Sequence, residues 1–349
     1  MNIIVLCGGY SPERDVSIKS GAMIAAALRE RGHKAVLIDA YFGYTGKYDD
    51  PAEIFERDYD DSITEISEEV PDLKKLASSR MQKNPYSRIG DNLMEVCSAA
   101  DIVFLAMHGS DGENGKLQAA FDIAGVKYTG SGYLGSAIAM NKSAAKDMFI
   151  RNNIKTPEGK NINVADEDKS APCFPCVVKP RGAGSSVGTS IAHDEDEYAA
   201  ALDFAFEYED DAVVERYIKG REIDVGVIDG VALPPIEICP KSGFFDYKNK
   251  YQSGMTDEYC PADLSENVTE RLKKAAVDVF KALYLDVYAR MDFIVDRNGE
   301  IYCLEANTLP GMTPASLMPK EAAAAGIEYG DLCEMIIRKS LEKYEKGSF

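Results

Sequence analysis

The sequence predicts an α/β fold in which a Rossmann-like amino-terminal domain is followed by a larger α+β part. Three observations support this prediction. A strand at residues 2–6 leads through a glycine turn into a helix and a second strand. A lysine-bearing strand at residues 176–180 precedes a glycine-serine loop and another strand. Residues 290–307 have the pattern of a β-hairpin, which predicts antiparallel strands near the carboxyl terminus.

The size of the chain predicts more than one domain. It has 349 residues, of which 45% are hydrophobic, and this is enough to fill several cores. We expect an amino-terminal domain at residues 1–130, a central lobe at residues 131–214 and a carboxyl-terminal lobe at residues 215–349.

The composition excludes several classes of function. A net charge of −19 argues against a general binder of nucleic acids or anionic membranes, because both require a basic surface. No apolar run is long enough to cross a membrane, and Met1 leads directly into a strand-like segment rather than a signal peptide. The eight cysteines are scattered through apolar runs, which is typical of reduced cysteines that pack in cores. We therefore expect a cytoplasmic protein.

The amino-terminal segment predicts one wall of a ligand site. Its first strand ends in Gly8-Gly9, and Ser17 is a candidate cap for the helix that follows. A second strand at residues 35–38 completes a βαβ unit, and ligands of open α/β sheets bind beside such turns. A third glycine is missing at the distance that dinucleotide binding requires. The turn therefore predicts a Rossmann-like wall with Glu13 at its rim, and not an NAD pocket.

A second turn of this kind follows the next buried strand. Residues 102–107 are apolar and end at His108, which begins a glycine-rich stretch. If the strands are parallel, His108 lies at the same sheet edge as Glu13. A role in substrate binding and a role in anchoring its own loop are equally compatible with this position. The polar, acidic residues 41–91 predict surface loops and short helices and indicate little about function.

The central part contains a candidate phosphate site. A helix there carries Lys142, which reaches either a phosphate or solvent. The next strand carries Lys179, and the loop Arg-Gly-Ala-Gly-Ser-Ser-Val-Gly follows at residues 181–188. Small residues let backbone N–H groups approach an anion, while Ser185 and Ser186 add hydroxyl donors. The loop lacks the GxxxxGK[ST] pattern, so we do not expect a P-loop fold.

Two further segments predict a nucleotide site with a lid. A strand at residues 212–215 leads into polar residues whose backbone groups are placed to bind an adenine. Glu222 is placed to bind the ribose hydroxyls, whereas Tyr217 is equally explained as a core aromatic residue. Residues 243–251 alternate apolar and polar side chains, which predicts a loop that closes over the site and keeps water from a reactive intermediate.

The segment near the carboxyl terminus predicts a hairpin that pairs two acidic residues. Strand-forming runs at residues 293–295 and 301–304 flank Asn298-Gly299, a favoured two-residue turn because both positions tolerate positive φ. With this turn, Asp292 lies opposite Glu305.

The acidic face of this hairpin is a candidate metal site. Because side chains alternate between faces, Asn307 shares the face of Glu305. Oxygen ligands of this kind suit Mg²⁺, which takes one or two carboxylates and completes its shell with water and substrate phosphates. Taken alone, the pattern is equally compatible with an acidic, solvated rim.

Together, these motifs resemble the D-alanine–D-alanine ligases of the ATP-grasp superfamily. The resemblance extends from about Ile4 to the carboxyl-terminal helix, and so many matches in one order are specific. It implies that a two-lobed ATP-grasp domain follows the Rossmann-like domain. The matching motifs are Gly8–Ser17, His108-Gly109, Lys179-Pro180, Gly184–Gly188, Lys250-Tyr251, Arg290–Asp292 and Glu305–Thr313.

The resemblance implies a reaction in two steps. The carboxylate of one D-alanine takes the γ-phosphoryl group of ATP, and the amine of a second D-alanine attacks the acyl phosphate. The products are ADP, phosphate and D-alanyl-D-alanine, a peptidoglycan precursor. The implied cofactors are ATP and two Mg²⁺ ions, for which Mn²⁺ can substitute. The implied assembly is a homodimer formed through the amino-terminal domain.

The resemblance also implies roles for residues at the matching positions. The phosphates are bound by Lys142, Lys179, Ser185 and Ser186. Adenosine is bound by Glu215, Arg216, Tyr217, Ile218, Glu222 and Phe244. Mg²⁺ is bound by Asp292, Glu305 and Asn307. The first D-alanine is bound by Glu13 and His108, and the second by Lys250 and Ser316. A hydrogen-bonded link between domain, loop and lid is formed by Glu13, Ser185 and Tyr251. The substrate's tetrahedral oxyanion is stabilised by Arg290 and the amide of Gly311.

Three other functions compete with this interpretation. A sister ligase would join D-alanine to D-serine or D-lactate. D-lactate-forming relatives tend to carry histidine where this chain has Lys250-Tyr251, but D-serine is harder to exclude because small pocket changes accommodate one hydroxyl. A catalytically silent ATP-binding regulator would not need all the metal and phosphate residues. A Rossmann oxidoreductase is disfavoured by the missing fingerprint.

Overall fold

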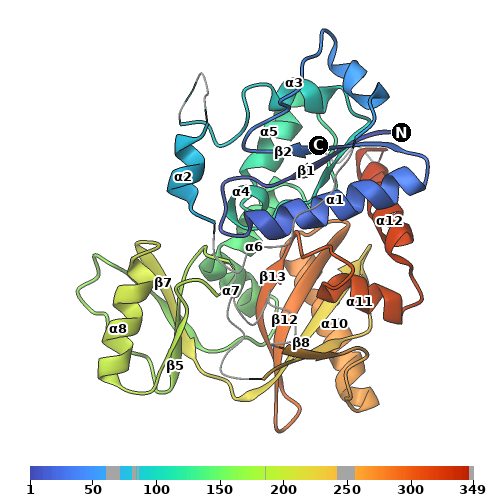
Figure 1. Ribbon diagram of the computed structural model, residues 1–349. Helices are drawn as coiled ribbons and strands as arrows, with labels where there is room; N and C mark the ends of the chain where they lie inside the picture. Colours follow the sequence, from blue (N-terminus) through green and yellow to red (C-terminus); the bar gives the residue numbers. More distant parts are fainter. Residues whose placement is uncertain (60–70, 81–83, 85, 185, 242–255, 346–349) are drawn as a thin grey trace.

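The chain folds into three β-sheets with helices packed around them. The computed structural model describes residues 1–59, 71–80, 84, 86–184, 186–241 and 256–345. In Figure 1 the amino-terminal domain lies at the top, the central lobe at the lower left and the carboxyl-terminal lobe at the lower right. None of the described helices is both long and apolar enough to cross a membrane.

The amino-terminal domain contains a parallel sheet in the order β2-β1-β3, as expected for a Rossmann-like unit. Its strands are Asn2–Cys7 (β1), Lys34–Asp39 (β2) and Ile102–Leu105 (β3). The sheet packs against α1 (Arg14–Glu30) and, from the far end of the chain, α12 (Tyr329–Glu345). The smaller helices are η1 (Pro51–Glu56), α2 (Leu73–Ser78), α3 (Leu93–Ser98), α4 (Ser110–Glu113) and α5 (Lys116–Ala124).

The predicted cap of the first helix is wrong. Helix α1 begins at Arg14, so Ser17 lies inside its first turn instead of before it. The Ser17 hydroxyl accepts a hydrogen bond from the Gly8 amide and donates one to the Ala106 carbonyl, both at 2.8 Å. Ser17 therefore fixes the glycine turn to the end of β3.

One hydrophobic core joins the amino-terminal domain to the carboxyl-terminal part. Ile4 and Phe104 of the parallel sheet belong to the same buried cluster as Tyr288, Leu309 and Ile336. These residues are fully or almost fully buried. The two parts of the chain therefore pack as one unit around the parallel sheet.

The central lobe is an antiparallel sheet in the order β4-β7-β5-β6, covered by α8 (Glu195–Phe206). Its strands are Gly159–Asn163 (β4), Cys176–Pro180 (β5), Ser190–Ala192 (β6) and Asp211–Arg216 (β7). Its buried residues, among them Val178, Leu202 and Val214, form a separate cluster. The expected start of the third unit, residue 215, lies within β7.

The carboxyl-terminal lobe has the largest sheet, in the order β11-β10-β8-β12-β13, with β9 paired to β8. Its strands are Gly220–Ile228 (β8), Val231–Ala232 (β9), Ile236–Pro240 (β10), Thr256–Tyr259 (β11), Tyr288–Asp296 (β12) and Ile301–Asn307 (β13). The associated helices are α6 (Tyr133–Met140), α7 (Lys142–Arg151), α10 (Glu266–Ala282) and α11 (Leu317–Ala324). Helices α6, α7 and α10 share one buried cluster with this sheet.

The β12-β13 hairpin pairs Asp292 with Glu305, as predicted, although its loop differs from the prediction. Near the turn, Val295 pairs with Ile301, and the Asp296 amide bonds to the Glu300 carbonyl at 2.9 Å. The loop therefore has three residues instead of two, and Gly299 occupies its positive-φ position at +74°. This longer loop shifts the pairing beside it by one residue.

A β-bulge restores the predicted pairing further along the hairpin. The register changes between Asp292 and Phe293, which leaves Leu304 as the extra residue on β13. Leu304 and Glu305 consequently both line the cleft described below, whereas Cys303 and Ala306 on either side belong to the buried core. The bulge therefore determines that Glu305 faces the cleft and not the core.

Candidate active site

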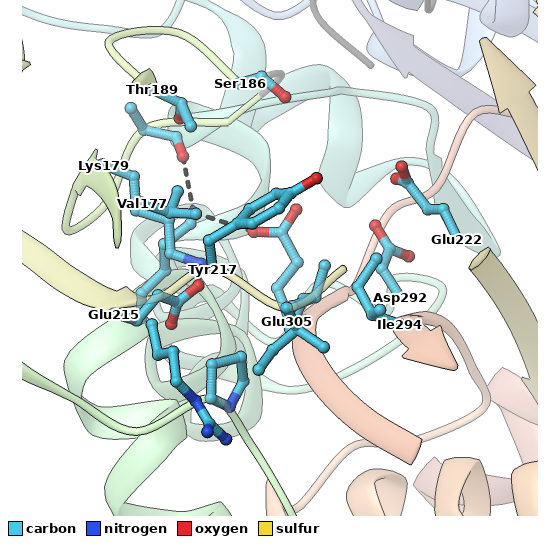
Figure 2. A pocket seen from close by; sticks show the side chains of 16 residues that line it. Val177, Lys179, Ser186, Thr189, Glu215, Tyr217, Glu222, Asp292, Ile294 and Glu305 are labelled. Carbon is cyan, nitrogen blue, oxygen red and sulfur yellow. Dashed lines mark hydrogen bonds and ion pairs between the residues drawn. The ribbon is translucent and has the colours of Figure 1, made fainter. Parts of the chain in front are cut away.

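A cleft of about 810 Å³, open to solvent, lies between the central and carboxyl-terminal lobes. In Figure 2, Val177, Lys179 and Thr189 come from the central lobe, and Glu222, Asp292 and Ile294 come from the other side. Most of the residues predicted to bind ATP line this cleft. They are Lys142, Lys179, Ser186, Glu215, Arg216, Tyr217, Ile218 and Glu222, joined by Asp292 and Glu305 of the predicted metal site.

Two lysines bring positive charge into the cleft. Lys179 donates a hydrogen bond to Glu215 Oε1 at 2.6 Å. Lys142 donates one to the Ala183 carbonyl at 2.7 Å, and its ammonium lies 3.2 Å from Glu305 Oε2. Burial acts to lower the pKa of Lys179, but the charges of Glu215 and Glu305 outweigh it and raise the pKa above its usual value. Lys179 is therefore a cation, as binding of a phosphate requires.

The glycine-serine loop of the central lobe approaches the amino-terminal domain. A Cβ atom on Gly184 would lie 3.2 Å from Glu13 Oε2, so the loop backbone passes close to this carboxylate. Ser186 lines the cleft with its backbone at a φ of +58°. The part of the loop that the structure describes therefore lies near Glu13, while the predicted hydrogen-bonded link through Ser185 and Tyr251 stays a prediction, because both positions lie outside the described residues.

The predicted metal ligands converge on one face of the hairpin. Asn307 donates a hydrogen bond to Asp292 Oδ2 at 2.9 Å, and Asp292 is paired with Glu305 across the strands. Within the described residues, no three His, Cys, Asp or Glu side chains form a complete metal-binding group. Two carboxylates and one amide fit Mg²⁺, because this ion takes its remaining ligands from water and phosphates.

Arg290 lies beside these ligands. Its Nε and one terminal nitrogen donate hydrogen bonds to both oxygens of Asp292, each at 2.9 Å. The same Nε lies 2.9 Å from Asp224 Oδ2 on the neighbouring strand β8. Burial acts to lower the pKa of Arg290, but Asp292 and Asp224 raise it well above its usual value. Arg290 is therefore a fixed cation at the edge of the metal site.

The His108 ring is fully engaged by the protein. Its Nδ1 lies 2.9 Å from the Leu309 carbonyl, and its Nε2 lies 3.1 Å from the Ser20 hydroxyl. Burial lowers the pKa of His108, which favours a neutral ring. Because a carbonyl only accepts, Nδ1 carries the proton and Nε2 accepts from Ser20. These contacts correspond to the loop-anchoring alternative, with Glu13 near enough to influence the ring electrostatically.

The loop after β13 contains the predicted Gly311 and Ser316. The Ser316 hydroxyl accepts a hydrogen bond from the Thr313 amide at 3.1 Å. A Cβ atom on Gly311 would lie 2.9 Å from this hydroxyl, so the two predicted residues are close neighbours. The predicted Ser185, Phe244, Lys250 and Tyr251 lie outside the described residues.

The sequence interpretation missed three ionisable residues at the site, of which Asp224 and Lys146 are buried. Glu113 accepts hydrogen bonds from the amides of Gly109 and Leu309, at 2.9 and 3.0 Å, and thereby joins the amino-terminal domain to the loop after β13. The other two are Asp224, beside Arg290, and Lys146, beside Glu215. Burial raises the pKa of Glu113 to about 7. Asp224 could have been found from the sequence, because it is a charged residue within the apolar run of β8, where buried side chains are expected.

Two family models together match almost the whole chain. The model described as D-ala D-ala ligase N-terminus matches residues 2–131, and the one described as D-ala D-ala ligase C-terminus matches residues 144–338. Among curated relatives, the D-alanine–D-alanine ligase of Pediococcus pentosaceus is 42% identical, with 99% of each chain covered. That of Lacticaseibacillus casei is 43% identical, with 99% of this chain and 98% of the relative covered.

Solved structures agree with these relatives. The D-alanine–D-alanine ligase from Bacillus anthracis, complexed with ATP, is 32% identical with a TM-score of 0.77, and 99% of each chain is covered. The VanG D-Ala:D-Ser ligase from Enterococcus faecalis is 28% identical with a TM-score of 0.75, over 97% of this chain and 98% of that one. The predicted fold class, a Rossmann-like domain followed by an ATP-grasp domain, is confirmed. The chain belongs to the D-alanine–D-alanine ligase family.

Proposed function

We propose that this chain is an ATP-dependent ligase that joins two D-alanine molecules into D-alanyl-D-alanine. The observation that carries the proposal is the cleft between the lobes. Its lining includes the lysines Lys142 and Lys179 as well as the carboxylates of Asp292 and Glu305. Cations opposite candidate metal ligands suit the transfer of a phosphoryl group, because this chemistry depends on positioning and charge neutralisation.

In the first step, a carboxylate oxygen of D-alanine bonds to the γ-phosphorus of ATP while the bond to ADP breaks. Lys142 and Lys179 bind the phosphates, and the residues from Glu215 to Ile218 bind the adenosine with Glu222. Asp292, Glu305 and Asn307 hold Mg²⁺, which when bound neutralises charge on the phosphates. Glu13 binds the ammonium group of this first D-alanine.

In the second step, the amine of another D-alanine, having lost a proton, bonds to the acyl carbon, and phosphate leaves. Arg290 and the Gly311 amide stabilise the negative charge on the carbonyl oxygen. His108 and Glu113 hold the backbone at Leu309, two residues before Gly311, so they fix the position of this amide. Ser316, with Lys250, binds the carboxylate of the second substrate.

The reaction is tested by ADP release from ATP and Mg²⁺ with D-alanine, followed by mass spectrometry of the product. D-Serine and D-lactate compete as second substrates, because one structural neighbour is described as a D-Ala:D-Ser ligase. We expect mainly D-alanyl-D-alanine. Accumulation of only a mixed product would contradict the proposed second subsite, and nucleotide binding without turnover would favour a regulator.

We also propose a homodimer formed through the amino-terminal domain and a cytoplasmic location. Ile123 on α5 is 90% exposed, which makes this helix a candidate part of the dimer interface. All eight cysteines are free thiols, as is usual in a reducing compartment. Light scattering on the purified chain distinguishes a dimer from a monomer, and Ile123→Lys should weaken the dimer.

A further inference from the structure

Helix α7 carries a second lysine, Lys146, to which the proposed reaction assigns no role. Lys146 is 8% exposed. Its ammonium donates hydrogen bonds to Glu215 Oε2 at 2.7 Å, to the Pro157 carbonyl at 2.6 Å and to the Thr156 hydroxyl at 3.1 Å. An ammonium group has three protons, so each of them has an acceptor inside the protein.

Lys146 lies behind the wall of the nucleotide cleft. Glu215 and Pro157 line the cleft, whereas Lys146 is not among the lining residues. It follows Lys142 by four positions on α7, so the two lysines lie on the same side of this helix. Lys146 therefore acts on a bound nucleotide only through the residues that it holds.

The two oxygens of Glu215 have different partners. Oε2 accepts from Lys146, which also bonds to the Pro157 carbonyl and the Thr156 hydroxyl, and Oε1 accepts from Lys179 at 2.6 Å. Among the described residues, Lys179 donates to no acceptor other than Glu215. Burial acts to raise the pKa of Glu215, but Lys179 and Lys146 outweigh it and lower the pKa, so Glu215 is a carboxylate.

We propose that Lys146 is a positioning residue that fixes Glu215 Oε2 and so presents Oε1 to the base of a bound nucleotide. Lys179 can then move from Oε1 to a phosphate without releasing Glu215. This inference rests on the proposed function only insofar as the cleft takes a nucleotide.

The anchored carboxylate should contribute to base selectivity. A carboxylate accepts hydrogen bonds and cannot donate them. It therefore favours a purine with an amino group at position 6 over one with a carbonyl oxygen there. If Lys146 holds Glu215 in place, removing Lys146 should weaken binding of the 6-amino purine more than binding of the 6-oxo purine.

The test is calorimetric titration of the whole chain with ADP and with IDP, which needs neither D-alanine nor turnover. We expect Lys146→Met to raise the Kd for ADP about tenfold and to change the Kd for IDP less than about twofold. Lys146→Gln keeps hydrogen-bonding capacity without the charge. Its Kd for ADP should lie between those of the unmodified chain and Lys146→Met. Thermal unfolding of each variant checks that it is folded.

Two controls separate this role from a general loss of structure. Lys155→Met removes a half-exposed lysine that pairs with Glu300 and lies one residue before Thr156. It should leave both Kd values unchanged. In a Glu215→Gln background, Lys146→Met should change the Kd for ADP less than about twofold, because the residue that it positions is already altered.

Several outcomes would overturn the inference. They are ADP binding by folded Lys146→Met and Lys146→Gln within about twofold of the unmodified chain, equal weakening for ADP and IDP, and a full tenfold effect in the Glu215→Gln background. Failure of the unmodified chain to bind ADP would overturn the proposed function as well, so the two failures are distinguishable.

Discussion

The amino-terminal domain and the central lobe are attached to the carboxyl-terminal lobe in different ways. The amino-terminal domain shares one buried core with residues such as Tyr288 and Leu309 and with helix α12. The central lobe has a core of its own, to which α8 and the strands β4 to β7 contribute. Its contacts with the surrounding chain at the cleft include the ion pair of Glu215 with Lys146 and the hydrogen bond from Lys142 to the Ala183 carbonyl.

This difference indicates how the two sides of the cleft are stabilised. Apolar burial is permanent and independent of substrate, and it holds Glu13, His108 and the loop after β13 in one body. Ionic contacts can exchange partners when a charged substrate enters. We therefore expect a bound substrate to change the position of the central lobe more than that of the amino-terminal domain. Glu13, His108 and Ser316, which are proposed to bind D-alanine, thus lie outside the central lobe, and the glycine-serine loop belongs to it.

The largest expected effect comes from the residue that faces the adjustable lobe across the cleft. Glu305→Ala removes a proposed metal ligand and the partner of Lys142. We expect ADP release to fall on the order of a thousandfold, because charge on the phosphates is no longer neutralised. Glu300→Ala, which removes a half-exposed glutamate at the base of the same hairpin loop, is the matched control. Near-normal ADP release by a folded Glu305→Ala chain would remove Glu305 from the site.

Two leucine substitutions compare the shared core with the separate one. Leu332→Ala on α12 and Leu202→Ala on α8 each remove a buried side chain, at a cost of about 3 kcal/mol. Hydrogen exchange should increase in both β1–β3 and β12 for Leu332→Ala, but mainly in β4–β7 for Leu202→Ala. Equal increases throughout the chain in both variants would show that the two cores unfold together.

A buried carboxylate should make the fixed body sensitive to alkaline pH. Burial raises the pKa of Glu321, on α11, to about 8. Since this folded pKa exceeds the unfolded value of about 4.3, the protonated form favours folding, and stability is lost as pH rises from about 4 to 8. From pH 6 to pH 9, this residue should lower the free energy of unfolding by about 3 kcal/mol.

Glu321→Gln tests this pH dependence. The variant keeps the oxygen that accepts the Gly226 amide at 2.9 Å and cannot ionise. Urea unfolding at pH 6 and pH 9 should therefore give a smaller loss of stability in the variant than in the unmodified chain. An unchanged loss would assign the pH dependence to another group, such as Glu113.

The smallest expected effect comes from an exposed ion pair within the central lobe. Arg181 lies 2.6 Å from Asp211, but their side chains are 40% and 27% exposed. Arg181→Gln should change the free energy of unfolding by at most about 0.5 kcal/mol, because solvent already screens this pair. Urea unfolding at low and high salt measures the change. A loss above 1 kcal/mol, as roughly expected for a buried pair, would show that solvent screens the pair less than its exposure indicates.

Much of the fold was predictable because its signals are local. Strand runs such as residues 176–180 and the glycine turn after β1 depend on neighbours in sequence, and the structure contains both. The position of Asp292 opposite Glu305 was predicted from the alternation of side chains along a hairpin. The three-residue loop was not predicted, because Asn-Gly is compatible with more than one loop length.

Residues that depend on distant contacts were harder to predict. Glu113 contacts Leu309, and Lys146 contacts Glu215, across separations in sequence that no local pattern records. Their places at the site become recognisable only once the lobes are assembled.

The bulge has a consequence for how the length of this hairpin can vary. Leu304 is unpaired, while Cys303 and Glu305 on either side of it pair with Phe293 and Asp292. A variant that lacks Leu304 should therefore keep the pairing of Asp292 with Glu305, in a ladder without a bulge. A variant that lacks Ala306 should instead turn Asn307 to the opposite face, because side chains alternate along a strand. Differences in length among relatives are therefore expected at the bulge and not between Glu305 and Asn307.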